Sequence, residues 1–151
     1  WPDRRTNPRI APGQTVYMSG WCSGAPGIGL ARLGCMTVHD NETIRRDVEA
    51  AMAYSLANGL LVRDHLCCGN ASHIEWLLEA GLHLERHDLL AAARDRMLAV
   101  LNRKDRDGGY RFSADSQGSL IANPSFFQGT SGIGYQLLRL TDPAKFPGVV
   151  R

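Results

Sequence analysis

The chain has 151 residues, of which 44% are hydrophobic and 21% are charged; this composition is typical of one globular domain with its own core, and it argues against a disordered chain or a coiled coil. The formal net charge of +2 is too small to indicate nucleic acid or an acidic membrane surface as a partner. The sequence contains no apolar run of about 18 residues and no basic-then-apolar leader, so we expect neither a membrane span nor a secretory signal.

The first 20 residues mix prolines and glycines with polar residues. This pattern predicts an irregular segment with a short extended piece over residues 14–18. The chain starts with Trp1-Pro2 and not with Met, so we expect it to be processed, excised from a longer protein or incomplete.

A short apolar helix is predicted within residues 21–35. Pro26 suits a first helical turn, because the backbone N–H that proline lacks has no partner there in any case. Gly34 is expected to stop the helix. The glycines at its entrance would let its backbone approach a neighbouring element closely.

Residues 40–58 carry the clearest pattern of a surface helix. Asp40 or Asn41 is expected to cap its start, and Gly59 is expected to cap its end. The positions expected to face the core follow helical spacing and are Ile44, Val48, Ala51, Met52 and Ser55.

Three further helices are predicted over residues 70–84, 88–102 and 130–140, with a turn at 107–109. Residues 110–122 look less regular and partly extended. The apolar positions of the first two of these helices are Ile74, Leu77, Leu78 and Leu82, then Leu89, Leu90, Ala93, Met97, Leu98 and Leu101.

Three segments of the chain align with one another: residues 21–33, 66–78 and 126–138. They share Gly24, Gly69 and Gly129, which are spaced by 45 and 60 residues, and each segment opens a short apolar helix. Repeats of this size indicate stacked helical hairpins. With the short helices inside and the amphipathic ones outside, we expect an all-α fold: a partial α/α toroid of about three stacked hairpins with glycine-entered inner helices.

The cysteines do not follow this repeat. Cys22 aligns with Cys67, and Ser23 with Cys68, but the third segment has Phe-Gln at residues 127–128 and no thiol. The shared glycines therefore serve the fold, whereas the thiols indicate chemistry. Three thiolates with an open position are typical of a catalytic zinc site; buried, unreactive cysteine is the alternative.

Cys67 and Cys68 are adjacent, and adjacent side chains of a helix diverge by about 100°. They can share one ion only if their backbone is non-helical, which the neighbouring Gly69 allows. A helix that starts at Asn70 would favour thiolates there. The fourth cysteine, Cys35, has no partner motif, and the uneven spacing of the four favours reduced thiols of a cytosolic protein over two disulfides.

The motifs WCSGAPGIGLARL, LCCGN and GTSGIGYQLLRL, at residues 21–33, 66–70 and 129–140, resemble the last three glycine motifs of the lanthionine synthetase C-like cyclase family. They are most similar to the cyclase domain of class II (bifunctional) lanthipeptide synthetases, a subset of which has Cys-Cys-Gly in the second motif. The resemblance implies that residues 1–151 are the C-terminal part of such a domain, and therefore a fragment of a larger chain.

The resemblance also implies a toroid with Zn²⁺ at its centre, ligated here by Cys22, Cys67 and Cys68. The implied reaction, in lanthipeptide (lantibiotic) biosynthesis, is Michael-type addition of a cysteine thiolate to dehydroalanine or dehydrobutyrine, which forms thioether rings. The implied partners are a dehydrated precursor peptide and an upstream dehydratase domain of the same chain, in the cytoplasm. A non-catalytic zinc-binding scaffold and a glutathione-adding relative are the alternatives.

Two departures from the family pattern concern its other catalytic residues. The family's His-Gly motif, which carries a general acid/base, does not occur here, so we expect that residue upstream of Trp1. Met18 stands where some members have an arginine. Within this chain the possible catalytic residues are His65 and His73, each with a purely structural role as the alternative.

Overall fold

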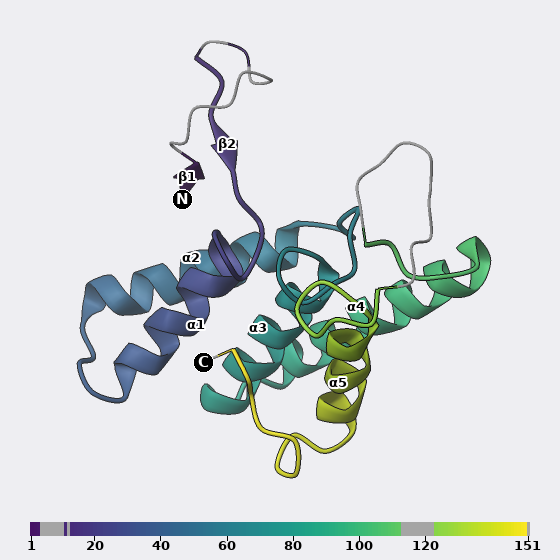
Figure 1. Ribbon diagram of the computed structural model, residues 1–151. Helices are drawn as coiled ribbons and strands as arrows, with labels where there is room; N and C mark the ends of the chain where they lie inside the picture. The colour runs from purple at the N-terminus through teal and green to yellow at the C-terminus, as the bar shows by residue number, and fades with distance from the viewer. Residues whose placement is uncertain (4–10, 12, 113–122, 151) are drawn as a thin grey trace.

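The computed structural model describes residues 1–3, 11, 13–112 and 123–150, and these form almost nothing but helices and their connections (Figure 1). The elements are β1 (Pro2–Asp3), β2 (Val16–Tyr17), α1 (Ala25–Met36), α2 (Glu42–Ala57), α3 (Asn70–His83), α4 (His87–Asp107) and α5 (Thr130–Thr141). The all-α class is confirmed. Across the described ranges, no helix combines the length and the apolar character that a membrane crossing requires.

The extended piece expected near residues 14–18 is β2. It pairs antiparallel with β1, with Pro2 opposite Tyr17 and Asp3 opposite Val16. The irregular stretch expected at 110–122 lies outside the described residues from 113 onward.

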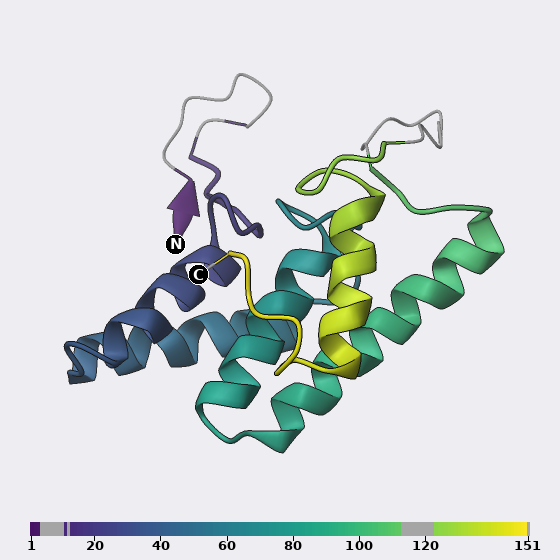
Figure 2. The same ribbon diagram turned by 60° about the horizontal axis from the view of Figure 1, so that its bottom comes forward.

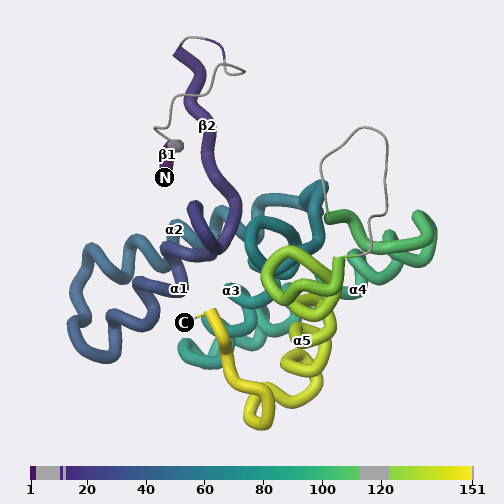
Figure 3. The backbone as a smooth tube through the Cα atoms, in the orientation of Figure 1, coloured from purple at the N-terminus to yellow at the C-terminus, as the bar shows by residue number. Residues whose placement is uncertain are grey.

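The helices form an arc of two layers (Figures 1 and 3). The glycine-entered helices α1, α3 and α5 lie side by side with α3 in the middle, while α2 packs against α1 and α4 against α3. After α5, residues 142–150 run back across α3 toward the start of α1 without forming a helix (Figure 2). The three repeats thus contribute two complete hairpins and the inner helix of a third, which agrees with a partial α/α toroid.

Helix α3 is buried on all sides from Asn70 to Gly81, as expected for the central inner helix. Leu82 differs, with 39% of its surface exposed, because it lies in the last turn, where the neighbouring helices no longer cover α3. In α4, Leu98 is 57% exposed and Val100 is buried instead. The buried stripe of α4 passes through Met97, and Leu98 is turned about 100° away from it.

All five predicted core positions of α2 are buried. Asn41 caps its start, because its side-chain oxygen accepts the N–H of Ile44 at 3.0 Å. The prediction that Gly59 caps the end is wrong. The helix ends at Ala57, and the amide of Asn58 donates to the carbonyl of Tyr54 at 2.7 Å.

Two other helix ends also differ from the predictions. Helix α1 continues through Gly34 to Met36, since glycine adopts helical angles as readily as left-handed ones. Helix α4 continues past residue 102 to Asp107 and ends at Gly108, whose φ of 81° is left-handed. The turn predicted at 107–109 is therefore the cap of α4.

Each inner helix begins directly after the shared glycine, where its loop folds back tightly. A side-chain carbon added to Gly24, Gly69 or Gly129 would lie 2.2, 2.7 or 2.1 Å from the carbonyl oxygen of the residue six positions earlier. No side chain fits there, because real carbon–oxygen contacts are longer than 3 Å. The repeat thus keeps glycine for a steric reason.

A buried ionic cluster joins α3 to α5. The guanidinium of Arg139 pairs with both Glu75 and Glu79, and all three side chains are buried. Gln136 donates to Glu75 at 2.7 Å, and Arg139 also donates to the carbonyl of Phe146 at 3.0 Å. Burial raises the pKa of Glu75, although Arg139 opposes this effect. The cluster fixes how the third repeat sits on the second.

Candidate metal centre

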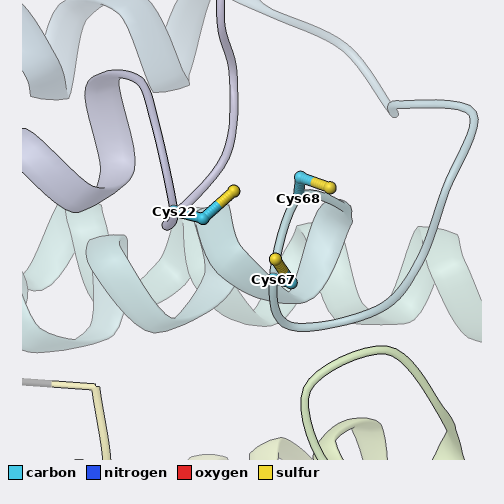
Figure 4. A group of neighbouring side chains, drawn as sticks. All are labelled: Cys22, Cys67 and Cys68. Carbon is cyan, nitrogen blue, oxygen red and sulfur yellow. The ribbon is translucent and has the colours of Figure 1, made fainter.

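Three cysteine side chains meet where the loop before α1 lies beside the loop before α3. The sulfur atoms of Cys22, Cys67 and Cys68 all lie within 4.8 Å of one another (Figure 4). Cys22 is exposed, Cys67 and Cys68 are half-buried, and all three are free thiols. Cys35 is also free, but it lies near the other end of α1 and outside this cluster.

The donor set and its spacing fit a metal ion. Thiolates suit Zn²⁺, and Zn–S bonds of about 2.3 Å in a tetrahedral site place the sulfur atoms roughly 3.8 Å apart. Sulfur atoms that lie within 4.8 Å need to move by only about 1 Å to reach this spacing. Three ligands leave one corner of the tetrahedron open for a fourth.

The local backbone has the form that two adjacent ligands require. Cys67 and Cys68 lie in a turn, and α3 begins only at Asn70. The expectation of non-helical backbone at this pair is confirmed. Since a turn does not impose the 100° separation of helical neighbours, both side chains can face Cys22.

Hydrogen bonds of the backbone hold the three repeat loops side by side. The N–H groups of Trp21 and Cys22 donate to the carbonyl of Cys67 at 2.8 and 3.4 Å, and the N–H of Cys67 donates to the carbonyl of Phe127 at 2.8 Å. Cys22, Cys67 and Phe127 are equivalent positions of the repeat. The same contact therefore occurs at both joints, and it sets the distance between Cys22 and the cysteine pair.

A close approach at Gly20 completes this joint. A side-chain carbon added to Gly20 would lie 2.6 Å from the Cβ atom of Cys68. Trp21 stacks on Phe127 with ring centroids 5.2 Å apart. Its indole N–H donates to the carbonyl of Val150 at 3.1 Å.

The connection from α2 to α3, which carries the cysteine pair, is anchored by contacts with Asn70 and with Arg103 of α4. Asn70, fully buried, bonds the backbone of Leu61 in both directions at 2.8 and 3.0 Å. The buried carboxylate of Asp64 pairs with Arg103 of α4, and its second oxygen accepts the backbone N–H of Arg111 at 2.9 Å. These contacts make the loop a rigid support for the thiols.

The two candidate catalytic histidines both take part in holding the loops. Nδ1 of His65 accepts the N–H of Cys68 at 3.3 Å. Nε2 of His73 lies 2.9 Å from the carbonyl oxygen of Ser19, close to Cys22 in the chain. The hydroxyl of Ser19 lies 2.9 Å from the same nitrogen. Because a carbonyl only accepts, the contact with the carbonyl is a hydrogen bond when Nε2 carries the proton. Burial lowers the pKa of both rings, that of His73 to about 4.

Negative charges on the neighbouring thiols would repel one another, so the cluster disfavours ionisation of Cys67. Burial, together with the neighbouring Cys22 and Cys68, raises the pKa of Cys67 to about 12. Without a cation this thiol therefore keeps its proton, and a metal ion that binds here must displace it. A cationic group of the described chain faces the cluster: Nη1 of Arg63 donates to the sulfur of Cys68 at 3.7 Å.

Sequence reasoning missed the support that surrounds the thiols. Arg63, Asp64 and Asn70 stand within six residues of the cysteine pair, so their nearness was a usable signal. Arg103 had no such signal, since it lies 39 residues from Asp64. Val150 is further still, 129 residues from Trp21.

The family model described as "Lanthionine synthetase C-like protein" matches residues 1–151, the whole chain. A search of curated proteins finds no match.

Proposed function

The chain belongs to the lanthionine synthetase C-like family, and on that basis we propose that it binds zinc through Cys22, Cys67 and Cys68 and closes thioether rings in a dehydrated precursor peptide. We further propose that residues 1–151 form the C-terminal part of the cyclase domain of a class II synthetase. An upstream dehydratase domain of the same chain would then supply the dehydrated peptide.

The observation that carries the proposal is the gathering of three free thiols from two repeat loops within 4.8 Å. The third repeat has the same loop and the same backbone contact but no thiol. The fold alone therefore does not require the cysteines. A ligand set of three thiols with a free corner suits an ion that must accept a substrate sulfur.

The three cysteines differ in their proposed roles at the site. A zinc ion held by Cys22, Cys67 and Cys68 would lower the pKa of a substrate thiol bound to it, and so would supply a thiolate near neutral pH. Cys67 and Cys68 hold their side of the site rigid, because α4 and Asn70 anchor their loop. Cys22 is the exposed ligand, so the open side of the site faces solvent, where a peptide has access.

The proposed reaction is balanced without any oxidant or reductant. The peptide thiol loses its proton, and its sulfur forms a bond to the β-carbon of dehydroalanine or dehydrobutyrine. The electrons of the carbon–carbon double bond move to the α-carbon, which then takes up one proton. His65 and His73 both hold backbone groups of the site, and we propose that the proton-transfer residue lies upstream of Trp1.

The test uses the full-length protein with Cys22→Ser, Cys67→Ser and Cys68→Ser, and with Cys35→Ser as the matched control. Bound zinc is measured by inductively coupled plasma mass spectrometry after dialysis. Ring closure does not change the peptide mass, so it is followed by the loss of alkylatable thiols. We expect the first three variants to lose zinc and ring closure, because each lacks one ligand, and Cys35→Ser to retain both.

The alternatives give different results. Full zinc in all three variants would refute the metal site. Zinc that depends on the three cysteines, without ring closure by the full-length protein, would indicate the non-catalytic scaffold. Consumption of glutathione by a dehydrated peptide, without ring closure, would indicate the glutathione-adding alternative.

A further inference from the structure

Arg63 is a charged residue beside the cluster to which the proposed function assigns no role. Its Nη1 donates to the sulfur of Cys68 at 3.7 Å, and its side chain is half-buried. Within residues 1–3, 11, 13–112 and 123–150, no carboxylate pairs with it, and the adjacent Asp64 pairs with Arg103. The positive charge of Arg63 is therefore directed at a thiol.

The backbone of Arg63 is fixed across the turn from Cys68. Its carbonyl oxygen accepts both the backbone N–H and the side-chain amide of Asn70, each at 2.9 Å. The same oxygen lies against Gly69. The contact with the sulfur thus starts from an anchored position, which limits the entropy lost when the side chain is held there.

The internal repeat shows that the arginine accompanies the extra thiol. Six positions before the shared glycine, the first repeat has Met18 and the third has Asn123. Only the second repeat has an arginine there, Arg63, and only the second has a cysteine, Cys68, directly before its glycine. Since the loops share one backbone form, the fold itself does not call for arginine at this position.

The charges explain why the two residues belong together. A divalent cation with three thiolates carries one net negative charge, and a substrate thiolate adds a second. Cys67 and Cys68 are half-buried, and unbalanced charge is costly where water is partly excluded. One guanidinium beside Cys68 offsets the charge of that thiolate. In the net charge of the site, the pair of Arg63 and Cys68 then counts like a neutral ligand.

We propose, on the basis of the zinc site proposed above, that Arg63 is a positioning residue that offsets the negative charge of the Cys68 thiolate and orients its sulfur toward the metal ion. The role belongs to the thiolate and not to the loop. Removing Arg63 therefore weakens metal binding only when residue 68 is a cysteine.

The experiment measures zinc affinity of the full-length protein by competition with a chromophoric chelator, in a double-mutant cycle. Arg63→Met is made in the wild type and in a Cys68→His background, where the third ligand is neutral. We expect Arg63→Met to lower zinc affinity about 10-fold or more in the wild type. In the Cys68→His background we expect a change of less than about 3-fold, since there is no charge to offset.

Two further variants separate charge from structure. Arg63→Lys keeps the charge without the planar fork and is expected to have an affinity between those of the wild type and Arg63→Met. Arg45→Met is the matched control, because that guanidinium pairs with Asp40 on the exposed face of α2 and not with a thiol, and its affinity is expected to equal the wild type.

Three results would overturn the role of Arg63: wild-type affinity in Arg63→Met, an equal loss in both backgrounds, or no advantage of lysine over methionine. Failure of the proposed function has a different signature. If zinc binding depends on Arg63 but no ring forms, the cyclase function fails and the role of Arg63 stands. If rings form and zinc affinity is indifferent to Arg63, only its role fails.

Discussion

Burial fixes the protonation state of His73, whose ring lies between the loop before α1 and Tyr54 of α2. Nε2 is bonded to Ser19, the ring stacks on Tyr54 with centroids 6.4 Å apart, and Nδ1 is buried without a partner. A second proton on the ring would place a charge in a buried position where no described residue accepts from Nδ1. Desolvation therefore lowers the pKa of His73 to about 4.

The stability of the metal-free protein should depend on pH through this residue. The folded pKa of about 4 lies below the ordinary value of 6.5, so the unfolded chain binds more protons between these values. The contribution of neutral His73 to the free energy of unfolding is complete above about pH 6.5 and is lost as the pH falls toward 4. Between pH 7 and pH 5 we expect a loss of about 2 kcal/mol, measured by urea unfolding of the wild type and of His73→Gln, which lacks this loss.

His87→Gln is the control for that comparison, because His87 is exposed at the start of α4 and its replacement should leave the pH dependence as in the wild type. Other buried groups, such as Glu75, also titrate in acid, so the quantity to compare is the difference between variants. Identical pH dependence in the wild type and His73→Gln would contradict the assignment.

The elements that matter most are the inner helices, which begin against their own preceding loops. A side-chain carbon added to Gly27 would lie 1.9 Å from the carbonyl oxygen of Trp21, and one added to Gly132 would lie 2.0 Å from that of Phe126. In the second repeat this position is Ser72, whose hydroxyl donates to the carbonyl of Gly69 at 2.7 Å. The first turn of each inner helix thus locks the loop that carries the candidate ligands.

Two glycines of α1 provide a matched test of this arrangement. Gly27→Ala should cost about 2 kcal/mol or more, because the new carbon meets the backbone of Trp21, and it should also weaken zinc binding through the neighbouring Cys22. Gly34→Ala meets nothing within 4 Å and should stabilise the same helix by about 0.5–1 kcal/mol.

Chemical unfolding and chelator competition measure both effects of these substitutions. A neutral Gly27→Ala would show that the loop has room to shift. A destabilising Gly34→Ala would contradict the open space found around Gly34, near the C-terminal end of α1.

At the scale of the whole molecule, the segment after α5 connects the third repeat to the first. It follows α5 and runs back across α3 (Figures 1 and 2). Along this path the carbonyl of Phe146 accepts a hydrogen bond from the guanidinium of Arg139, and Val150 is buried in the core, where its carbonyl accepts the indole N–H of Trp21. Since Trp21 precedes Cys22, this segment supports the candidate ligand that comes from the first hairpin.

Trp21→Phe tests this connection, because phenylalanine keeps an aromatic ring against Phe127 but removes the N–H that bonds Val150, together with one ring of the indole. We expect the free energy of unfolding to fall by at least about 1 kcal/mol, since packing is lost along with the hydrogen bond. Tyr135→Phe removes a hydroxyl that bonds the carbonyl of Pro147 at an exposed site, and we expect almost no effect, since water replaces that partner. Equal losses in urea unfolding of both variants would contradict the connection.

Local patterns predicted much of this architecture. The core face of α2, the starts of α1, α3 and α5 and the non-helical cysteine pair follow from helical spacing, caps and glycine turns, which act within a few residues. The ends at Gly34 and Gly59 were mistaken, because glycine permits a helix to stop but does not force it to. The third repeat contributes an inner helix, and the described chain after it passes across α3 without a helix.

The sequence by itself determined the helical repeat and its inner and outer layers, because both rest on residue type and short-range spacing, whereas the resemblance of its motifs to the family implied the three candidate ligands. Only the tertiary structure decided which groups surround those ligands. Arg139 meets Glu75 across 64 residues, and Trp21 meets Val150 across 129. No periodicity records such pairs, since they depend on how whole helices stack. The same stacking brings Cys22 to Cys67 and Cys68, so the candidate centre is a property of the joint between two repeats.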